Sequence, residues 1–248
     1  MAKRKLQRFA EVETFDNVAK PTIEEAMNDS FPLKGKWHKD FFKNDNPIVL
    51  ELACGKGEYT IGLAKNYANK NFIGIDIKGN RLWNGAKYAL QNKMTYVAFV
   101  KTRIDFITNL FGPDEVSEIW ITFPDPQKPK NRARKRLTGE IFLERYRRLM
   151  KKGGTVNLKT DSTFFYEFTN EVVKENKLEV KVNSANVYEE LIPSLGEASL
   201  AKDLMIRTYY ESRWLSEEKK IKFISFIHAN IHICDVFIEL FHFITINR

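Results

Sequence analysis

The chain has 248 residues, 43% of them apolar, which is enough for one large domain with a buried core. Its 40 Lys and Arg against 32 Asp and Glu give a net charge of +8, which is compatible with a nucleic acid or an acidic membrane surface as partner. The two cysteines, Cys54 and Cys234, form no Cys-x-x-Cys pair, so we expect a reducing, cytoplasmic compartment and no zinc site. The charged start Met1–Lys5 has no apolar stretch behind it, which argues against a secretory signal.

Residues 1–46 are polar with scattered aromatic side chains, and we expect a loosely packed arm with one or two short helices. From Ile48 onward, short apolar runs alternate with longer amphipathic stretches, a pattern typical of buried parallel strands connected by helices. The expected strands are Ile48–Leu52, Asn71–Asp76, Thr95–Val100, Glu118–Phe123 and Thr155–Lys159. The expected helices are Tyr59–Tyr67, Asn80–Leu90, Ile104–Phe111, Thr138–Met150 and Thr163–Glu175.

This alternation predicts an α/β fold with a doubly wound, mostly parallel sheet and helices on both of its faces. Thr138 is the expected N-cap of the fourth helix, and Gly153-Gly154 is its expected stop. Two later segments, Leu178–Val187 and Leu204–Tyr210, are expected as strands that close one edge of the sheet. The predicted organisation is an N-terminal arm (1–46), an α/β domain (47–215) and an apolar C-terminal extension (216–248).

Acidic side chains lie at or just after the carboxyl ends of several expected strands. Ligands of doubly wound sheets bind at that edge, because the connecting loops there form a crevice. Four acids at successive strand ends are difficult to explain by chance. They are Glu51, Asp76, Asp125 and Asp161.

The turn after the first expected strand is rich in small residues, with the pattern Ala53-x-Gly55-x-Gly57. Glycine allows a ligand to approach the backbone closely. Asp76 lies 19 residues beyond Gly57, where an acid can accept hydrogen bonds from ribose hydroxyls. The turn lacks the Gly-x-Gly-x-x-Gly and P-loop patterns, and Glu51 would disfavour a pyrophosphate. S-adenosylmethionine, with its amino group and sulfonium, therefore fits better than NAD or ATP.

The segment after the fourth expected strand combines one carboxylate with many cations. Asp125 lies between two prolines, and six Lys and Arg side chains follow within residues 128–136. Cations of this kind bind a phosphate backbone, while a nearby carboxylate can contact a base. The alternative is a solvated basic loop with an Asp turn, which basic runs usually are. The position of the segment at a strand end favours an enzyme that modifies nucleic acid.

Six short motifs follow one another along the chain: Glu51-Leu-Ala-Cys-Gly-Lys-Gly, Gly74-Ile-Asp76, Phe123-Pro-Asp125-Pro, Arg134-Lys-Arg-Leu137, Lys159-Thr-Asp161 and Thr208-Tyr-Tyr-Glu211. Taken together, these motifs resemble the bacterial tRNA (guanine-N7)-methyltransferase family over roughly residues 45–215. The resemblance implies a class I, Rossmann-like methyltransferase fold, S-adenosylmethionine as cofactor, and a guanine in the variable loop of tRNA as substrate. It also implies that the N7 atom is the methylated position.

The resemblance also implies roles for individual residues. Asp125 matches the catalytic aspartate of the family, and its position also places it against the cofactor. The matching cofactor-binding residues are Glu51, Gly55, Gly57 and Asp76. The matching substrate-binding residues are Lys128, Lys130, Arg132, Asp161, Thr208 and Glu211, and either Lys128 or Lys130 can replace a family lysine.

The chain departs from the family pattern at several positions. Ala53 replaces the first glycine of the turn, and Gln127 replaces the tryptophan that follows Pro-Asp-Pro. The family lysine after that tryptophan aligns with Pro129. Where relatives carry an acid beside the adenine, this chain has Arg103, with Asp105 two positions later, so either residue is a candidate for the adenine contact.

Residues 221–246 are unusually apolar and include His228, His232 and Cys234. A metal site there is less favoured than ordinary packing, because no fourth ligand is placed. Asp235 and Glu239 argue against a membrane span, because ionisable groups are costly in a bilayer. We expect an added helix or strand pair that covers an apolar face or a subunit contact, in a monomer or a homodimer.

Other functions remain open at this point. A different S-adenosylmethionine enzyme would act on another RNA or on a small molecule, and the second of these would not need the cationic loop. A non-catalytic RNA-binding module would have lost the cofactor, which the acids Glu51 and Asp76 argue against. A NAD-dependent dehydrogenase ranks last. The sequence does not indicate which tRNAs or which nucleotide position would be used.

Overall fold

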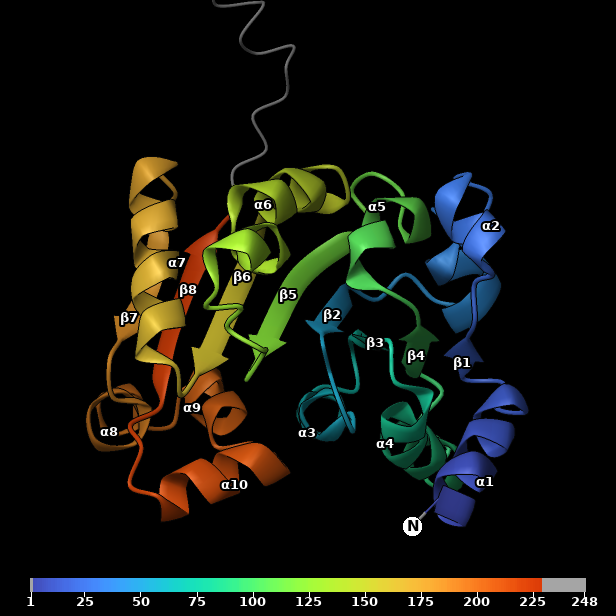
Figure 1. The fold of residues 1–248 in the computed structure, drawn as a ribbon, viewed down its shortest axis with the longest axis horizontal. Coiled ribbons are helices and arrows are strands. Elements are labelled where there is room, and N and C mark those ends of the chain that lie inside the picture. Colours follow the sequence, from blue (N-terminus) through green and yellow to red (C-terminus); the bar gives the residue numbers. More distant parts are fainter. Residues whose placement is uncertain (1, 229–248) are drawn as a thin grey trace, which may run out of the picture.

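The computed structural model describes residues 2–228, which form one mixed sheet with helices on both faces (Figure 1). The strands are β1 (Val18–Ala19), β2 (Ile48–Leu52), β3 (Asn71–Asp76), β4 (Val97–Lys101), β5 (Val116–Thr122), β6 (Met150–Thr160), β7 (Val180–Ser184) and β8 (Lys222–Ile227). Their order across the sheet is β1-β4-β3-β2-β5-β6-β8-β7. Strands β1 to β6 pair in parallel, whereas β8 is antiparallel to both β6 and β7.

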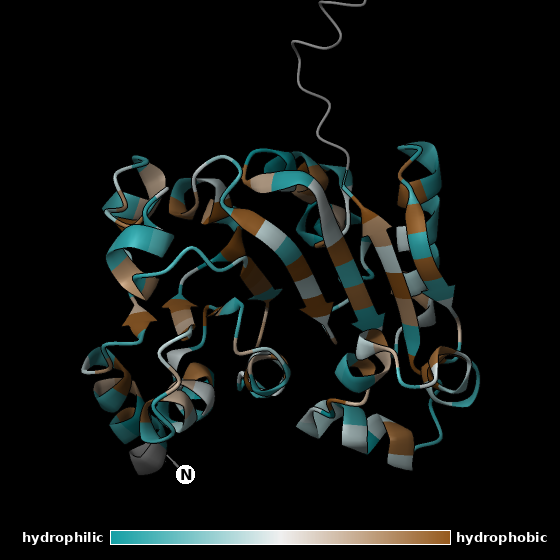
Figure 2. Cartoon of the chain, turned by 180° about the vertical axis from the view of Figure 1, so that it is seen from behind, coloured by the Kyte–Doolittle hydropathy of each residue, from teal (hydrophilic) through white to brown (hydrophobic). Residues whose placement is uncertain are grey.

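Alternating side chains of the strands form two apolar cores, one on each face of the sheet. Leu50 and Ile73 belong to the core covered by α5, α6, α7 and η1, while Val49 and Phe72 belong to the core covered by α1, α3, α4 and α9. Figure 2 shows hydrophobic residues concentrated along the strands.

The helices are α1 (Ala2–Glu13), α2 (Ile23–Met27), α3 (Glu58–Asn66), α4 (Gly79–Gln91), α5 (Ile107–Leu110), α6 (Glu140–Arg147), α7 (Thr163–Glu175), α8 (Ile192–Leu195), α9 (Ser199–Leu204) and α10 (Tyr209–Ser216). Shorter helical turns are η1 (Trp37–Phe42), η2 (Ile104–Phe106), η3 (Lys130–Lys135) and η4 (Val187–Leu191).

The five expected parallel strands are confirmed as β2 to β6, within a few residues at their ends. The expected helices are also present, although Ile104–Phe111 divides into η2 and α5. The predicted N-cap at Thr138 is wrong. Its hydroxyl lies buried, 2.7 Å from the Thr169 hydroxyl, and α6 begins after Gly139. Gly153-Gly154 lies within β6, because α6 already ends at Arg147.

The late part of the sheet differs from the prediction. Leu178–Val187 does contain strand β7, but Leu204–Tyr210 is not a strand: it spans the end of α9, a connecting loop and the start of α10. Thr208 begins α10 because its hydroxyl accepts a hydrogen bond from the Glu211 amide at 3.1 Å, as in a capping box. The strand that pairs with β6 is β8 instead. The sheet therefore continues past the predicted boundary at residue 216.

The N-terminal segment packs against the sheet, so the prediction of a loose arm is wrong for this part. Strand β1 pairs with β4, and the Trp37 side chain is fully buried. The Trp37 indole N–H donates to the Leu110 carbonyl at 2.9 Å. The Glu115 carboxylate accepts hydrogen bonds from the backbone amides of Gly35 and Trp37, both at 2.9 Å, which fixes the entry into η1.

Most of the apolar tail, including His232, Cys234 and His242, lies outside the described residues. Within residues 2–228, no helix combines the length and the apolar character needed to cross a membrane. The same residues contain no group of three or more His, Cys, Asp or Glu side chains arranged to hold a metal ion.

Candidate active site

The strand order reverses between β2 and β5, which are neighbours in the sheet although two strands separate them in the chain. A crevice forms at such a reversal, because the loops after the two strands turn toward opposite faces. The turn Ala53–Gly57 follows β2, and the segment Phe123–Gln127 follows β5. The two most informative sequence motifs therefore meet at one point.

The turn after β2 is held in a left-handed backbone conformation. Gly55 and Gly57 have φ values of +57° and +71°, and Ala53 also has a positive φ, +58°. A Cβ atom on Gly57 would lie 2.5 Å from the Phe99 ring, so glycine is required there by space as well. Ala53 adopts the conformation for which the family uses glycine, at a cost of about 1 kcal/mol.

Asp76, at the end of β3, fixes the turn and faces a cavity. One carboxylate oxygen accepts a hydrogen bond from the Gly55 amide at 3.0 Å, and the other accepts from the Lys78 amide at 2.8 Å. A carboxylate has about four acceptor positions, so two remain for a ligand. Gly55 and Gly57 contribute the shape of the turn, whereas Ala53 and Asp76 line the cavity.

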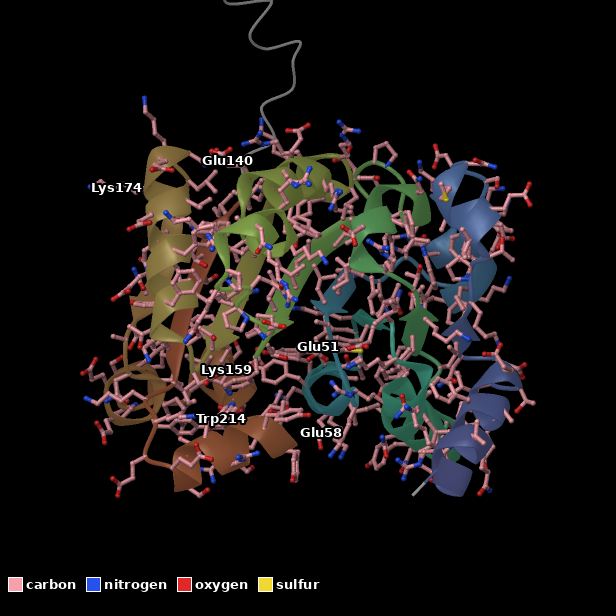
Figure 3. The ribbon with its side chains drawn as sticks, in the orientation of Figure 1. Glu51, Glu58, Glu140, Lys159, Lys174 and Trp214 are labelled. Atoms are coloured by element: carbon pink, nitrogen blue, oxygen red, sulfur yellow. The ribbon has the colours of Figure 1, made fainter. Side chains whose placement is uncertain are left out.

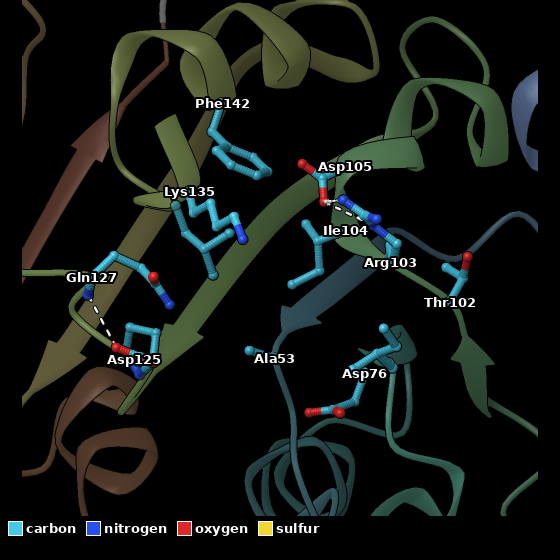
Figure 4. Close-up of a pocket in the computed structure, with 13 residues that line it drawn as sticks. Ala53, Asp76, Thr102, Arg103, Ile104, Asp105, Asp125, Gln127, Lys135 and Phe142 are labelled. Atoms are coloured by element: carbon cyan, nitrogen blue, oxygen red, sulfur yellow. Dashed lines mark hydrogen bonds and ion pairs between the residues drawn. The ribbon is translucent and has the colours of Figure 1, made fainter. Parts of the chain in front are cut away.

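The first cavity has a volume of about 420 Å³, within the range of small-molecule sites (Figure 4). Its apolar lining includes Ile104 and Ile77, which is 59% exposed although it is large and apolar. Arg103 and Asp105 also line this cavity, and the Arg103 guanidinium donates to the Asp105 carboxylate at 3.1 Å. Asp105 therefore provides a fixed acceptor beside an apolar slot.

Glu51 lies behind the turn, and its buried carboxylate faces Thr60 and Thr122. It accepts hydrogen bonds from the Thr60 amide at 2.7 Å, from the Thr60 hydroxyl, and from the Thr122 hydroxyl at 2.6 Å. Burial raises the pKa of Glu51 to about 7, although these hydrogen bonds act in the opposite direction. Its predicted contact with the cofactor remains a prediction.

Asp125 stands on a strained turn between the two cavities. The residues on either side of Pro124-Asp125-Pro126 have positive φ values, +48° at Phe123 and +47° at Gln127, and such strain is concentrated at functional sites. The Asp125 carboxylate is exposed and accepts a hydrogen bond from the Gln127 amide at 3.0 Å. Asp125 and Pro124 line both cavities, so this turn forms a shared wall.

The second cavity, of about 910 Å³, combines aromatic and cationic side chains. Tyr210 and Trp214 of α10 line one side, and Phe164 lines another. Two of the predicted substrate residues, Lys128 and Asp161, line it as well. Further cations in the lining are Arg81, Lys219, Lys220 and Lys222.

The basic segment divides between the two cavities and solvent. Lys128 lines the second cavity and Lys135 the first, whereas Lys130 and Arg132 are exposed on η3. Arg136 folds back and donates to the carbonyls of Gln127 and Lys128, both at 3.2 Å. Arg136 thus holds the segment beside Asp125.

Comparisons with known proteins agree with this geometry. A family model described as "Putative methyltransferase" matches residues 45–224. A tRNA (guanine-N(7)-)-methyltransferase of Bacteroides fragilis is 44% identical over 100% of this chain and 96% of its own length. One of Porphyromonas gingivalis is 48% identical over 87% of this chain and 86% of its own length. The chain belongs to this methyltransferase family.

Solved structures agree at the level of the fold. An antibiotic-related methyltransferase has a TM-score of 0.52 at 17% identity, covering 76% of this chain and 90% of its own. The 16S rRNA methyltransferase KamB has a TM-score of 0.50 at 13% identity, covering 76% of this chain and 91% of its own. The predicted class I, doubly wound fold of the family is therefore confirmed. The family match ends at residue 224 rather than 215, because it includes part of β8.

Two residues that the family resemblance assigns to substrate lie at the start of α10. Thr208 is its N-cap, and Glu211 completes the capping box by accepting from the Thr208 amide. The Glu211 carboxylate is fully buried and lies 2.7 Å from the Lys159 ammonium group. Burial lowers the pKa of Lys159 to about 8, against the effect of the Glu211 carboxylate. Figure 3 shows Lys159 near the lower end of β6, on the side of α10.

Several lining residues were missed from the sequence. Ile77 directly follows Asp76, and Ile104 directly precedes Asp105, so their position beside acids near strand ends could have indicated that they line the cavity. Gln127 points into the first cavity in Figure 4. Trp214 and the lysines of residues 219–222 follow the family motif of α10, but nothing local in the sequence indicates which cavity they face.

Proposed function

We propose that this protein transfers a methyl group from S-adenosylmethionine to N7 of a guanine in tRNA, in the variable loop as the family resemblance implies. The observation that carries the proposal is the shared wall at Asp125, with a nucleoside-sized cavity on one side and a cationic, aromatic cavity on the other. The tRNA (guanine-N(7)-)-methyltransferase names of the relatives support the same reaction. An enzyme for small molecules would not need the second, cationic cavity.

The first cavity fits S-adenosylmethionine by its chemistry. Ile77 and Ile104 would hold the adenine ring between apolar side chains, and Asp105 would accept from the adenine amino group. The remaining acceptor positions of Asp76 would bind the ribose hydroxyls. The Ala53–Gly57 turn leaves room for the methionine portion close to the backbone. When bound, this cofactor supplies an electrophilic methyl group on its sulfonium.

The second cavity fits a guanosine turned out of an RNA loop. In A-form RNA the N7 edge faces the deep, narrow groove, so the target base must leave its stack to be reached. Tyr210, which is 41% exposed, offers a ring for the base to stack on. Asp161 and the cations around the cavity lie where they would contact the nucleoside and its phosphates.

The reaction needs alignment more than a base. Guanine N7 carries a lone pair and no proton, so methyl transfer is a direct displacement whose main requirement is orientation. The product base is positively charged, and the Asp125 carboxylate would stabilise this charge as it develops. Asp125 would also accept from the guanine N1 and N2 donors, which adenine lacks in that arrangement.

The test is incubation of unmodified tRNA with the purified protein and labelled S-adenosylmethionine, followed by mass spectrometry of the nucleosides. We expect N7-methylguanosine in tRNA. A labelled product on another base, or on a small molecule only, would contradict the proposal. Binding of RNA without cofactor binding in calorimetry would instead indicate a non-catalytic RNA-binding module.

Substitution of Asp125 tests the residue at the shared wall. Asp125→Ala should lower turnover on the order of 100-fold, because it removes charge stabilisation in the transition state. Asp125→Asn keeps the size and one acceptor, so its activity should lie between those of Ala and wild type. Cofactor affinity, measured by calorimetry, should remain nearly unchanged in both.

Asp45→Ala is the matched control, because Asp45 is an exposed acid before β2, at the opposite edge of the sheet. Near-normal turnover of Asp125→Ala would refute the role of Asp125. We further propose that the enzyme works in the cytoplasm. We also propose that it is a monomer or a homodimer, and analytical ultracentrifugation would measure this oligomeric state.

A further inference from the structure

Helix α10 is one wall of the second cavity, and its attachment to the rest of the protein is unusual. Tyr210 and Trp214 line the cavity, and Trp214 and Leu215 are partly buried against the core. Among Tyr209–Ser216, all of them described by the structure, Glu211 is the one fully buried side chain. A charged group thus takes the place where an amphipathic helix normally buries an apolar side chain.

Both oxygens of the buried Glu211 carboxylate have partners. One oxygen lies 2.7 Å from the Lys159 Nζ and accepts a hydrogen bond from the Tyr188 hydroxyl at 2.9 Å. The other accepts from the Thr208 amide at 3.4 Å. Both charged side chains of the pair have no exposed surface. A buried pair of this kind is costly to break on one side, because the remaining charge stays buried without a partner.

Lys159 connects this pair to the catalytic turn. Its ammonium group has three donors, and besides Glu211 it reaches the carbonyls of Leu204 at 2.6 Å and Ile206 at 3.1 Å, in the segment that leads into α10. Its own carbonyl accepts from the Phe123 amide at 2.9 Å, beside the Pro124-Asp125 wall. Lys159 therefore contacts both the turn that carries Asp125 and the segment that carries the aromatic wall.

We propose that Lys159 and Glu211 are positioning residues that set α10, and with it Tyr210 and Trp214, at the correct distance from Asp125. In the described part of the chain, the second cavity is lined by Tyr210 and Trp214 but by neither Glu211 nor Lys159. Glu211 thus acts through the helix rather than by touching the nucleoside. The inference rests on the proposed function, because it assigns that helix to tRNA binding.

The experiment compares Lys159→Met, Glu211→Gln and the double variant with wild type. Steady-state kinetics with unmodified tRNA gives kcat and KM, calorimetry gives S-adenosylmethionine affinity, and hydrogen exchange follows the amides of residues 208–216. We expect each single variant to raise KM for tRNA at least tenfold, with cofactor affinity within threefold and faster exchange in α10. The double variant should recover part of the loss, because it leaves no unpaired buried charge.

Two further variants control for general destabilisation. Tyr188→Phe removes one hydrogen bond to Glu211 and keeps both charges, so it should fold and raise KM for tRNA by a few fold. Lys70→Met breaks the Lys70–Glu118 ion pair, which lies at the other end of the strands, and should leave KM unchanged.

A direct substrate contact by Glu211 predicts that Glu211→Gln is impaired while Lys159→Met is normal, which would overturn the proposal. Loss of cofactor affinity in step with tRNA affinity, with Tyr188→Phe unaffected, would also overturn it. A wild-type protein that methylates no tRNA would refute the proposed function. Unchanged amide exchange in α10 of Lys159→Met would instead refute the positioning role alone.

Discussion

At the scale of the residue, the direction of each acidic side chain determines whether it reaches a cavity. The acids at the strand ends are Glu51, Asp76, Asp125 and Asp161, and the structure places three of them in the lining of the two cavities. Glu51 is the exception, because side chains on a strand alternate between faces and its carboxylate turns toward Thr60 and Thr122. The sequence shows that an acid ends a strand, but the direction of its side chain depends on neighbours distant in the chain.

The buried Glu51 carboxyl predicts a pH dependence of stability. Its pKa is raised to about 7 in the folded state, above the value of 4.5 for an unperturbed carboxyl, so the folded protein binds more protons between these pH values. The contribution of Glu51 to stability is therefore present below pH 4.5 and is lost as the pH rises to about 7. Its upper limit is about 3 kcal/mol.

The measurement is urea unfolding of wild type and Glu51→Gln at several pH values. Glutamine has a similar shape and does not titrate, so the difference in unfolding free energy should shift in favour of Glu51→Gln as the pH rises from 5 to 8. Parallel pH profiles for the two proteins would show that Glu51 does not titrate in this range. Comparing the two proteins removes the contribution of all other groups.

At the scale of the element, local sequence signals predicted the bounds of most strands and helices. Contacts with residues distant in the chain determined the bounds and side-chain partners that the local signals did not predict. The β2–α3 and β3–α4 units were predicted within a few residues, because each has a buried strand and a loop-to-helix signal in one stretch. Thr138 looked like an N-cap, but its hydroxyl pairs with Thr169 of α7 instead. The sequence also did not indicate that Lys128 and Lys135, in the same cationic segment, line different cavities.

The exposed part of this segment predicts a salt effect on RNA binding. Lys130, Arg132 and Arg134 lie exposed on η3, which begins two residues after Lys128 of the second cavity, so they are placed to contact phosphates. Replacing all three by Gln should weaken tRNA binding and reduce the slope of log K against log salt by about 2, since each lost contact to single-stranded RNA contributes about 0.7. Filter binding at several salt concentrations measures both.

The matched control replaces Lys151, Lys152 and Lys174 by Gln. These exposed lysines lie at the start of β6 and near the end of α7, where Figure 3 shows Lys174, and they line neither cavity. The control removes three positive charges, as the η3 variant does. An equal loss of slope in both triple variants would show that net charge, rather than the position of η3, governs binding. Arg136 is left intact, because it supports the backbone beside Asp125.

At the scale of the whole molecule, the parallel strands β2 to β6 and the edge strand β7 were predictable, whereas β1 and β8 were not. A regular alternation of apolar runs and amphipathic stretches is sufficient for β2 to β6. Strand β1 has two residues and pairs with β4, and β8 pairs with β6 from the far end of the described chain, so no local pattern indicates either pairing. The N-terminal segment was expected to be loose because its composition is polar, yet a few aromatic side chains attach it firmly.

Trp37 tests whether this segment belongs to the same cooperative unit as the sheet. Its buried ring stacks on Phe111 with centroids 5.5 Å apart, and its indole N–H is bonded to Leu110. Trp37→Ala should lower the free energy of unfolding by roughly 3–5 kcal/mol, because it leaves a large cavity. Thermal unfolding followed by circular dichroism measures the change, with the highly exposed Ile23→Ala as control. An unchanged melting temperature would show that the segment unfolds independently.

The position of β8 has a consequence for how the chain is synthesised. The ribosome synthesises a protein from its N-terminus, so β6 and β7 are made before β8. Strand β8 lies between β6 and β7 in the sheet, so neither of them can pair with it until it has been made. Until Lys222–Ile227 leaves the exit tunnel, one long side of β6 has no hydrogen-bonded neighbour, and such a side invites pairing with other chains. A nascent chain stalled before residue 222 would therefore expose an unpaired strand edge, and the sheet is complete only after β8 has emerged.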